Sequence, residues 1–463
     1  DDSGTVSDNH DDAIVNSIME NGEIWKSSDM PCSAANSSSH CHTNGAADWL
    51  DSFRTEAELF YVEHRNLACE LELRRKLGKK AFPKKKSKNK ISTGTSKLVQ
   101  PRHDWPIFGK TGLSMSLVKS LGGGINLFSF DHGPAYQAAQ FAFWDAVDSM
   151  NPERFASILA EYPYHVDTLV QMSEVMRVNE DYQAAKDLIA RAIYGCECAF
   201  HPLFNVSRNS CRLDYCQAEN RSFFLALFRH TLSVAQRGCP RTALEFAKLL
   251  YSLSPLDDPL GIILLFDHYA LKSQEYDYLI NLYYALEANR NLSQLPSYAY
   301  SVPLAIHLKS VATNVIEKNT FLDDKADQLL QEAILKFPTV LKPLLDKICI
   351  EPDSKVSSHQ LFSNVEVTRD CGGFRTLVAI YVARNHAVWK DNIEWLERNV
   401  HAVIEKFDSK IGNDLYEEWM EIRRSRYVGS PKNILRHIVV SDLKEAMSDL
   451  PAVGGYKITS TAC

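Results

Sequence analysis

The chain has 463 residues, of which 45% are hydrophobic and 24% are charged. This composition predicts a globular protein, and the length predicts two or three domains or an extended solenoid. The formal net charge of −7 excludes a chain that coats nucleic acid along its whole length. The most apolar run, Leu260–Phe266, is far shorter than the roughly 20 residues of a transmembrane helix, so no membrane association is expected.

The first part of the chain, residues 1–50, predicts a disordered acidic tail. It carries seven acidic residues before the first lysine, and a Ser/Asn-rich stretch follows at Ser33–Ser39. Such a segment cannot bury enough apolar surface to offset the entropy of ordering it. Asp1–Gly4 has neither a basic nor an apolar region, so no secretory signal is expected.

The next segment, residues 51–124, is predicted to be basic and extended, with one or two short helices. Ten cations fall within 17 positions, from Arg74 to Lys90. Clustered lysines favour contact with phosphate backbones such as ribosomal RNA, and Lys84–Lys90 also has the composition of a nuclear localisation signal. The alternative is a solvated charge run that keeps a linker extended. Pro101–Gly112 is expected to be irregular, and Gly122–Gly124 to mark a flexible boundary.

Residues 125–369 predict helical hairpins that resemble tetratricopeptide repeats. Long apolar-periodic segments alternate with short breaks such as Asn151-Pro152 and Ser254-Pro255, which is not the pattern of βαβ units. In this template small residues let two helices approach, larger apolar residues fill the seam, and proline ends the second helix. The fitting positions are Leu169, Met172, Ser173, Met176, Ala185, Ile189 and Ala192 in a first hairpin; Leu227, Thr231, Val234, Ala243, Ala247, Leu250 and Pro255 in a second; Phe266 to Tyr283 in a third; and Ala326, Leu330, Ala333 and Pro338 in a fourth.

The predicted fold is therefore all-α: a degenerate, tetratricopeptide-like solenoid whose hairpins are irregularly spaced. An all-helical globule without true repeats is the alternative. Residues 370–451 are predicted to form a C-terminal helical cap, with Trp389, Ile393, Trp395 and Leu396 in its core. Residues 452–463 are predicted to be a disordered tail.

The sequence lacks the common signatures of catalytic chemistry. Gly122–Gly124 is not followed by Lys-Ser/Thr, and hydrolase elbows, zinc-protease helices and kinase motifs are missing. We therefore expect no enzymatic activity and no cofactor, since repeat scaffolds present surfaces instead of water-excluding clefts. A zinc site is a weaker alternative, because the Cys-x-Cys spacing is poor for two ligands of one metal; ordinary reduced thiols are expected at Cys196, Cys198, Cys211 and Cys216.

Several short stretches of the sequence are rich in arginine and aromatic residues. These residue types are typical of the strongest contacts in protein interfaces. A structural role competes with this interpretation, because His165 and Asp167 could cap a helix and Arg221 could form an internal ion pair. The candidate partner-binding residues are Tyr61, His64, Arg65, Lys84, Lys85, Lys86, Trp105, His165, Arg221 and Arg241.

Short stretches of this sequence resemble those of a known protein family. They are Tyr-Val-Glu-His-Arg at 61–65, Gly-Leu-Ser-Met at 112–115, Pro-Tyr-His-Val-Asp at 163–167, Glu-Cys-Ala-Phe-His-Pro-Leu-Phe at 197–204, Cys-Arg-Leu-Asp-Tyr at 211–215, Glu-Asn-Arg-Ser-Phe at 219–223, Arg-Gly-Cys-Pro-Arg-Thr-Ala-Leu-Glu at 237–245, Asn-Leu-Ser-Gln-Leu-Pro at 291–296 and Val-Ser-Ser-His at 356–359. On these strings the chain resembles the ribosome quality control complex subunit 1 family, known in animals as transcription factor 25 or nuclear localised protein 1. The resemblance is collinear over about residues 59 to 451.

The resemblance implies a non-catalytic role on stalled 60S ribosomal subunits. Family members act with the E3 ligase Listerin on unfinished nascent chains and promote ubiquitin chains of the linkage that the proteasome reads. The implied partners are Listerin, ubiquitin, the 60S subunit and its rRNA, a nascent-chain quality-control factor and the AAA ATPase that extracts the product. A second implied description is transcriptional repression, so both the cytosol and the nucleus are expected locations.

This chain departs from the family pattern at its ends. Family members usually carry a longer N-terminal section with acidic and lysine-rich blocks, whereas here a short acidic stretch precedes the Tyr61–Arg65 string. Functions of that section are therefore not carried over. The competing hypothesis is a nuclear regulator that binds DNA or a transcription factor through the basic segment, although Pro83 interrupts any basic helix there.

Overall fold

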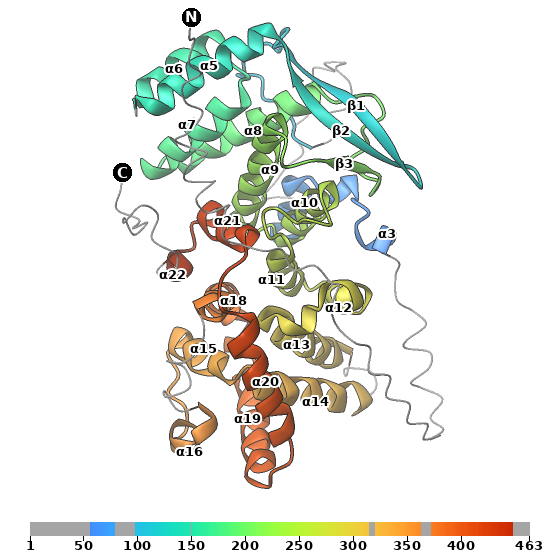
Figure 1. Cartoon of the computed structure of the whole chain (residues 1–463), viewed down its shortest axis with the longest axis vertical. Coiled ribbons are helices and arrows are strands. Elements are labelled where there is room, and N and C mark those ends of the chain that lie inside the picture. Colours follow the sequence, from blue (N-terminus) through green and yellow to red (C-terminus); the bar gives the residue numbers. More distant parts are fainter. Residues whose placement is uncertain (1–55, 79–97, 150, 314–319, 363–371, 448–463) are drawn as a thin grey trace, which may run out of the picture. The chain divides into compact units, whose positions relative to one another are not determined.

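Helices make up most of the chain that the structure describes (Figure 1). The computed structural model describes residues 56–78, 98–149, 151–313, 320–362 and 372–447. The chain divides into two compact units: residues 57–275, the amino-terminal unit, and the residues from Tyr276 onward, the carboxy-terminal unit. The prediction of a mainly helical protein is confirmed. The tails predicted at 1–50 and 452–463 lie outside the described residues, as do Lys84, Lys85 and Lys86.

The amino-terminal unit begins with three short helical segments, which are followed by a β-hairpin and a succession of packed helices. Its elements are η1 (His64–Asn66), α4 (Cys69–Leu77), β1 (Leu113–Gly122), β2 (Ile125–His132), α5 (Pro134–Asp148), α6 (Pro152–Glu161), α7 (Val166–Val178), α8 (Tyr182–Cys198), β3 (Cys211–Leu213), α9 (Ala218–Gln236), α10 (Pro240–Leu253) and α11 (Ile263–Ser273), preceded by α3 (Glu56–Leu59). From α5 to α11 each helix packs against the next along the chain.

Local sequence sets several of these helix starts. Asn151 accepts a hydrogen bond from the backbone N–H of Glu153 at 3.0 Å, and Pro152 occupies the first turn, where no backbone donor is needed. Asp181 accepts from the N–H of Ala184 at 2.9 Å and begins α8 in the same way. These breaks therefore lie where the sequence predicts the ends of helices.

The first two predicted hairpins correspond to α7 with α8 and to α9 with α10. Small residues lie buried in their seams, including Ser173, Ala192 and Thr231. The third predicted hairpin is divided, because α11 belongs to the amino-terminal unit and α12 (Tyr276–Arg290) to the other unit. A continuous solenoid therefore remains a proposal.

A three-stranded sheet is the main departure from the all-α prediction. Strand β1 pairs antiparallel with β2, and β2 pairs parallel with the short β3, in the order β1-β2-β3 (Figure 1). Gly122–Gly124 forms the turn between β1 and β2, and all three glycines have positive φ, which costs glycine little. The glycines are thus a hairpin turn and not a flexible boundary between domains.

The carboxy-terminal unit continues with helices only, among the residues described. Its elements are α12, η2 (Leu292–Gln294), α13 (Pro296–Thr313), α14 (Thr320–Lys336), η3 (Pro338–Val340), α15 (Leu341–Ile348), α16 (Ser354–Ser358), η4 (Gln360–Phe362), α18 (Gly372–Lys390), α19 (Ile393–Asp408), α20 (Asn413–Arg426), α21 (Lys432–Ser441) and α22 (Lys444–Met447). The fourth predicted hairpin is α13 with α14, where Ala326, Leu330 and Ala333 are buried.

Aromatic side chains fill the core of the carboxy-terminal unit. Trp389 of α18 is fully buried, and Trp395 of α19 stacks on His307 of α13 with ring centroids 4.1 Å apart. The indole N–H of Trp395 donates to Asp327 of α14 at 2.6 Å, so a single carboxylate ties α14 to α19. Among the described helices of the whole chain, none combines the length and the apolar character that crossing a membrane requires.

Candidate partner-binding surface

A strap, defined as residues Leu59–Leu77, lies across α10 of the amino-terminal unit. Phe60 is buried between Tyr251 and Phe266, with ring centroids 4.7 and 5.9 Å away. The backbone N–H of Val62 donates to the carbonyl of Ser207 at 3.0 Å. The Tyr-Val-Glu-His-Arg string therefore belongs to a segment that is docked on the helices and is not an extended linker.

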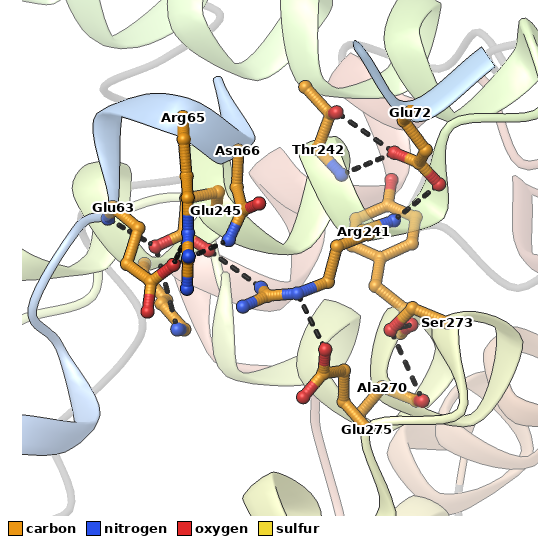
Figure 2. A network of polar contacts seen from close by, with 12 residues as sticks. Glu63, Arg65, Asn66, Glu72, Arg241, Thr242, Glu245, Ala270, Ser273 and Glu275 are labelled. Carbon is orange, nitrogen blue, oxygen red and sulfur yellow. Dashed lines mark hydrogen bonds and ion pairs between the residues drawn. The ribbon is translucent and has the colours of Figure 1, made fainter. Parts of the chain in front are cut away.

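The strap supplies the N-cap that α10 lacks locally. Cys239, which precedes the helix, makes no side-chain capping bond. Instead the carboxylate of Glu72 accepts from the backbone N–H groups of Arg241 at 3.2 Å and Thr242 at 2.8 Å, and from the Thr242 hydroxyl at 2.8 Å (Figure 2). An anion at a helix N-terminus satisfies free donors and interacts well with the helix dipole. A residue 170 positions earlier in the chain thus caps α10.

Glu245 of α10 in turn binds the backbone of the strap. Its fully buried carboxylate accepts from the backbone N–H of Glu63 at 2.7 Å and pairs with Arg241 at 2.6 Å (Figure 2). The ammonium of Lys248 lies 3.6 Å from the same carboxylate, and Arg241 also pairs with Glu275 at 2.6 Å. Because each buried charge has an opposite partner, removing any one of them would leave an uncompensated charge and destabilise the docked strap.

The environment of the network shifts the pKa values of its members. Burial opposes ionisation of Glu72, yet hydrogen bonds from Lys76 and Thr242 outweigh it and lower the pKa of this carboxyl. A hydrogen bond from Arg65 lowers the pKa of Glu63, and burial lowers the pKa of Lys248. Carboxylates with lowered pKa stabilise the fold above their unfolded pKa, and that stability is lost as the pH falls through the folded value.

Three candidate partner-binding residues lie on the strap at the surface. Tyr61 is 50% exposed, and the side chain of Arg65 is 72% exposed while it pairs with Glu63 at 2.7 Å. His64 is exposed but its Nε2 atom lies 2.5 Å from the hydroxyl of Ser207. Tyr61 and Arg65 therefore have the accessibility that an interface anchor needs, and their role stays a prediction.

The side chains of Trp105 and His165 instead form contacts inside the amino-terminal unit. The indole N–H of Trp105 donates to Asp187 at 3.0 Å, and its ring lies against Tyr194. His165 is buried at the N-terminus of α7, with Nδ1 2.8 Å from the Thr168 hydroxyl and Nε2 3.0 Å from Gln140. Neither side chain is available to a partner, so the capping alternative fits His165.

Arg221 and Arg241 are also used within the fold. Arg221 donates to the carbonyls of Tyr215 and Cys216, both at 3.2 Å, and Arg241 is the ion-pair partner of two carboxylates. Their conformations are set by intramolecular contacts, which leaves fewer donors for a partner. The sequence did not distinguish them from surface anchors because residue type and spacing do not specify which donors the fold uses internally.

The cysteines near His201 do not converge. Cys196 and Cys211 are buried while Cys198 and Cys216 are exposed. Cys211 is engaged with the backbone of Asn205, whose N–H lies 3.2 Å from the sulfur. Within the described ranges, no group of three or more His, Cys, Asp or Glu side chains could hold a metal ion.

Several surface features had no counterpart among the predicted site residues. Phe141 and Trp144 of α5 are exposed aromatic neighbours with ring centroids 5.4 Å apart. Strand β1 exposes Leu117, Val118 and Leu121. The alternation of apolar and serine residues from Leu113 to Leu117 is a period-two signal that predicts a strand.

Comparison with known proteins decides the family. The chain matches the family described as "Transcriptional repressor TCF25" over residues 128–460. The chain belongs to the TCF25 family. The resemblance inferred from the short strings is therefore confirmed. No solved structure matches the chain.

Relatives of this TCF25-family chain carry two kinds of name. A human protein named "Ribosome quality control complex subunit TCF25" is 43% identical over 400 residues, covering 85% of this chain and 59% of that protein. "Ribosome quality control complex subunit 1" of Schizosaccharomyces pombe is 32% identical, covering 55% of this chain and 37% of that protein. "Probable transcription factor claV" of Ampulloclitocybe clavipes is 30% identical, covering 68% and 41%. The chain spans less than two thirds of the length of each.

His165 offers a test of the buried capping role through pH. Burial lowers its pKa to about 3, from an ordinary value near 6.5. As the pH falls below 6.5, the unfolded chain binds a proton that the folded chain does not, so His165 makes stability decrease toward acid. Urea unfolding should show a shallower loss of stability between about pH 7 and about pH 5 for His165→Gln than for the unchanged protein. Asp167, whose pKa burial raises to about 6, acts in the opposite direction but is present in both proteins. Equal slopes would contradict the buried neutral imidazole.

Proposed function

We propose that the protein is a non-catalytic subunit of the ribosome quality control complex. It acts on stalled 60S subunits and promotes linkage-specific, proteasome-directed polyubiquitination of incomplete nascent chains by the E3 ligase Listerin. The observation that carries this proposal is the 43% identity with the human "Ribosome quality control complex subunit TCF25" over 85% of this chain. The proposed locations are the cytosol and the nucleus.

The helical units suit a role in positioning partners. A scaffold that holds ubiquitin or Listerin in one orientation presents one acceptor lysine to the reactive thioester, and proximity alone then raises the rate for that lysine. The docked strap supports this role, because Glu72 and Glu245 fix its backbone while Tyr61 and Arg65 face solvent. Tyrosine and arginine are common energetic centres of interfaces. Downstream, the AAA ATPase and a nascent-chain quality-control factor are the proposed partners.

The basic segment is the proposed contact with ribosomal RNA. The lysines at 84–90 lie outside the described residues, but both flanks are held by the amino-terminal unit. On one side Lys76 donates to the carbonyl of Gly238 at 2.9 Å, and on the other the N–H of Leu98 meets Glu197 at 3.3 Å. The described residues on either side of the basic run are therefore bound to the amino-terminal unit, and clustered lysines favour contact with phosphate.

Cosedimentation with 60S particles tests the RNA contact. Replacing Lys84, Lys85, Lys86, Lys88 and Lys90 by glutamine should weaken binding and reduce the slope of log K against log salt by about five, roughly one for each phosphate contact. The matched control replaces five lysines of the carboxy-terminal unit, Lys355, Lys390, Lys406, Lys410 and Lys444, and should leave the slope unchanged. An unchanged slope in the first variant would remove the basic segment from the proposal.

Reconstituted ubiquitination tests the proposed activity itself. Listerin with a stalled nascent chain on 60S particles should produce mainly proteasome-directed linkages when this protein is present and a broader mixture without it, as measured by mass spectrometry of the linkages. The double variant Tyr61→Ala with Arg65→Ala should move the mixture toward that without the protein. Identical ubiquitin linkages in all reactions would contradict the proposal.

A nuclear transcriptional repressor is the second candidate function. It is favoured by the family description "Transcriptional repressor TCF25" and by the relative named "Probable transcription factor claV". Specific regulation through DNA requires that the protein bind one DNA sequence far more tightly than other DNA sequences. Binding of DNA duplexes with low, salt-sensitive affinity and no sequence preference would count against this candidate.

A further inference from the structure

The sheet of the amino-terminal unit has one edge that is closed and one that is open. On the closed side, β3 pairs with β2 from Asn126 to Phe128, and the side chain of Asn220 accepts from the N–H of Phe130 at 2.9 Å. On the open side lies β1, and β2 is the only strand that pairs with it in the part of the chain that the structure describes. The outward N–H and C=O groups of an edge strand are a template for another strand.

The second half of the open edge carries Lys119 and two register shifts, which are devices that protect edge strands, whereas its first half has neither. Strand β1 is ten residues long and contains no proline and no acidic residue; Lys119 is its single charge. Leu117, Val118 and Leu121 are 39%, 55% and 50% exposed. Natural proteins commonly shorten, charge or cover such an edge, because it otherwise pairs with other chains. The stretch Ser114–Leu117, which has no charge, proline or register shift, is therefore the part of the edge that is open to a partner.

The base of the hairpin is held firmly. Phe128 and Phe130 of β2 are buried, and Phe130 packs against Phe223 with ring centroids 5.5 Å apart. Gly112 and Gly133 meet where the hairpin joins the helices, and a side-chain carbon on Gly133 would lie only 3.0 Å from the Gly112 carbonyl. The strand is thus presented in a fixed direction, which lowers the entropy cost of binding.

We propose that the free edge of β1 binds an extended polypeptide segment of a partner protein, which adds a fourth strand to the sheet. Only a polypeptide backbone offers donors and acceptors with the spacing of a strand, so this ligand class follows from the edge itself. Regular pairing is available along Ser114–Leu117, because the N–H of Leu113 already donates to the Thr111 hydroxyl at 3.2 Å and the register of β1 shifts near Val118. Apolar side chains of the segment cover Leu117, and an acidic residue pairs with Lys119. The proposal depends on the strand geometry and not on the ribosomal role.

Fluorescence anisotropy with a synthetic peptide tests the edge. The probe is a labelled ten-residue peptide of alternating valine and threonine with a central glutamate, and the control is the same peptide with every backbone N–H methylated. The probe should bind and slow amide hydrogen exchange in β1, whereas the methylated peptide should not bind, because it cannot donate to the edge. No binding of the probe, or equal binding of both peptides, would overturn the proposal.

Variants of the chain test where on the protein the peptide binds. Leu117→Lys with Val118→Lys should weaken binding of the probe about tenfold or more, since apolar contact is replaced by charge on an edge. The matched control, Val178→Lys with Leu256→Lys, changes two exposed apolar residues of the same unit and should leave affinity unchanged. Lys119→Glu should favour a probe with a central lysine over the glutamate probe. Concentration-dependent dimerisation that the first variant abolishes would assign the edge to a second copy of this chain and overturn the partner segment.

Discussion

Replacing Glu245 by alanine should lower the free energy of unfolding by about 3–5 kcal/mol, because it leaves buried cations without their partner. The carboxylate is fully buried, and it serves Glu63, Arg241 and Lys248 together. Loss of the bond to the Glu63 backbone should also release the strap. Urea unfolding measures the stability, and faster hydrogen exchange in residues 57–78 reports the release.

Two matched variants separate this effect from a general loss of charge. Glu275→Ala removes a carboxylate that also pairs with Arg241 but is 39% exposed, so about 1 kcal/mol or less is expected. Glu245→Gln keeps an acceptor for the Glu63 N–H and should be milder than alanine. If Glu245→Ala proved no worse than Glu275→Ala, the buried network would not hold the strap.

Replacing Trp389 by alanine should destabilise the carboxy-terminal unit by about 3–5 kcal/mol, the usual range for a buried tryptophan. Its ring lies parallel to that of Trp395 with centroids 6.0 Å apart, and its N–H donates to the Tyr381 hydroxyl at 2.7 Å. The variant therefore leaves a cavity among α13, α18 and α19 and removes one hydrogen bond to the Tyr381 hydroxyl. Hydrogen exchange should accelerate mainly in the described residues from Tyr276 onward, since the units are separately compact.

The control for this prediction is an apolar residue of the same unit that buries little surface. Ile411 is 64% exposed, and Ile411→Ala should change the free energy of unfolding by about 0.5 kcal/mol or less. Equal acceleration of exchange in α7 to α10 by Trp389→Ala would show that the two units unfold as one.

Short-range signals account for much of what the sequence predicted correctly. The helix starts at Pro152 and Tyr182 follow from capping residues only one position away. The burial of Leu169, Ala192 and Leu227 follows from apolar periodicity along single helices. The sequence alone does not reveal the hairpin although Leu113–Leu117 alternates, because a run of three glycines also suits a flexible boundary.

The candidate site was less predictable than the helices. Tyr61 and Arg65 lie at the surface, but His165 and Arg241 have the same residue types as interface anchors and are engaged inside the unit. Residue type alone does not distinguish these cases, because the difference lies in how each side chain is packed and paired in the fold. Phe141 and Trp144 show the converse, because both are large aromatic side chains and yet both are exposed.

The sequence by itself determined a mainly helical protein of the TCF25 family, since helix periodicity, caps and family strings are all local patterns. Only the tertiary structure decided that the Tyr61–Arg65 string belongs to a strap, that Glu72 caps α10 from 170 residues away, and that β1 ends the sheet with a free edge. The physical reason is that capping, ion pairing and strand pairing between distant segments depend on where folding brings donors and acceptors. Their positions along the chain do not specify those encounters.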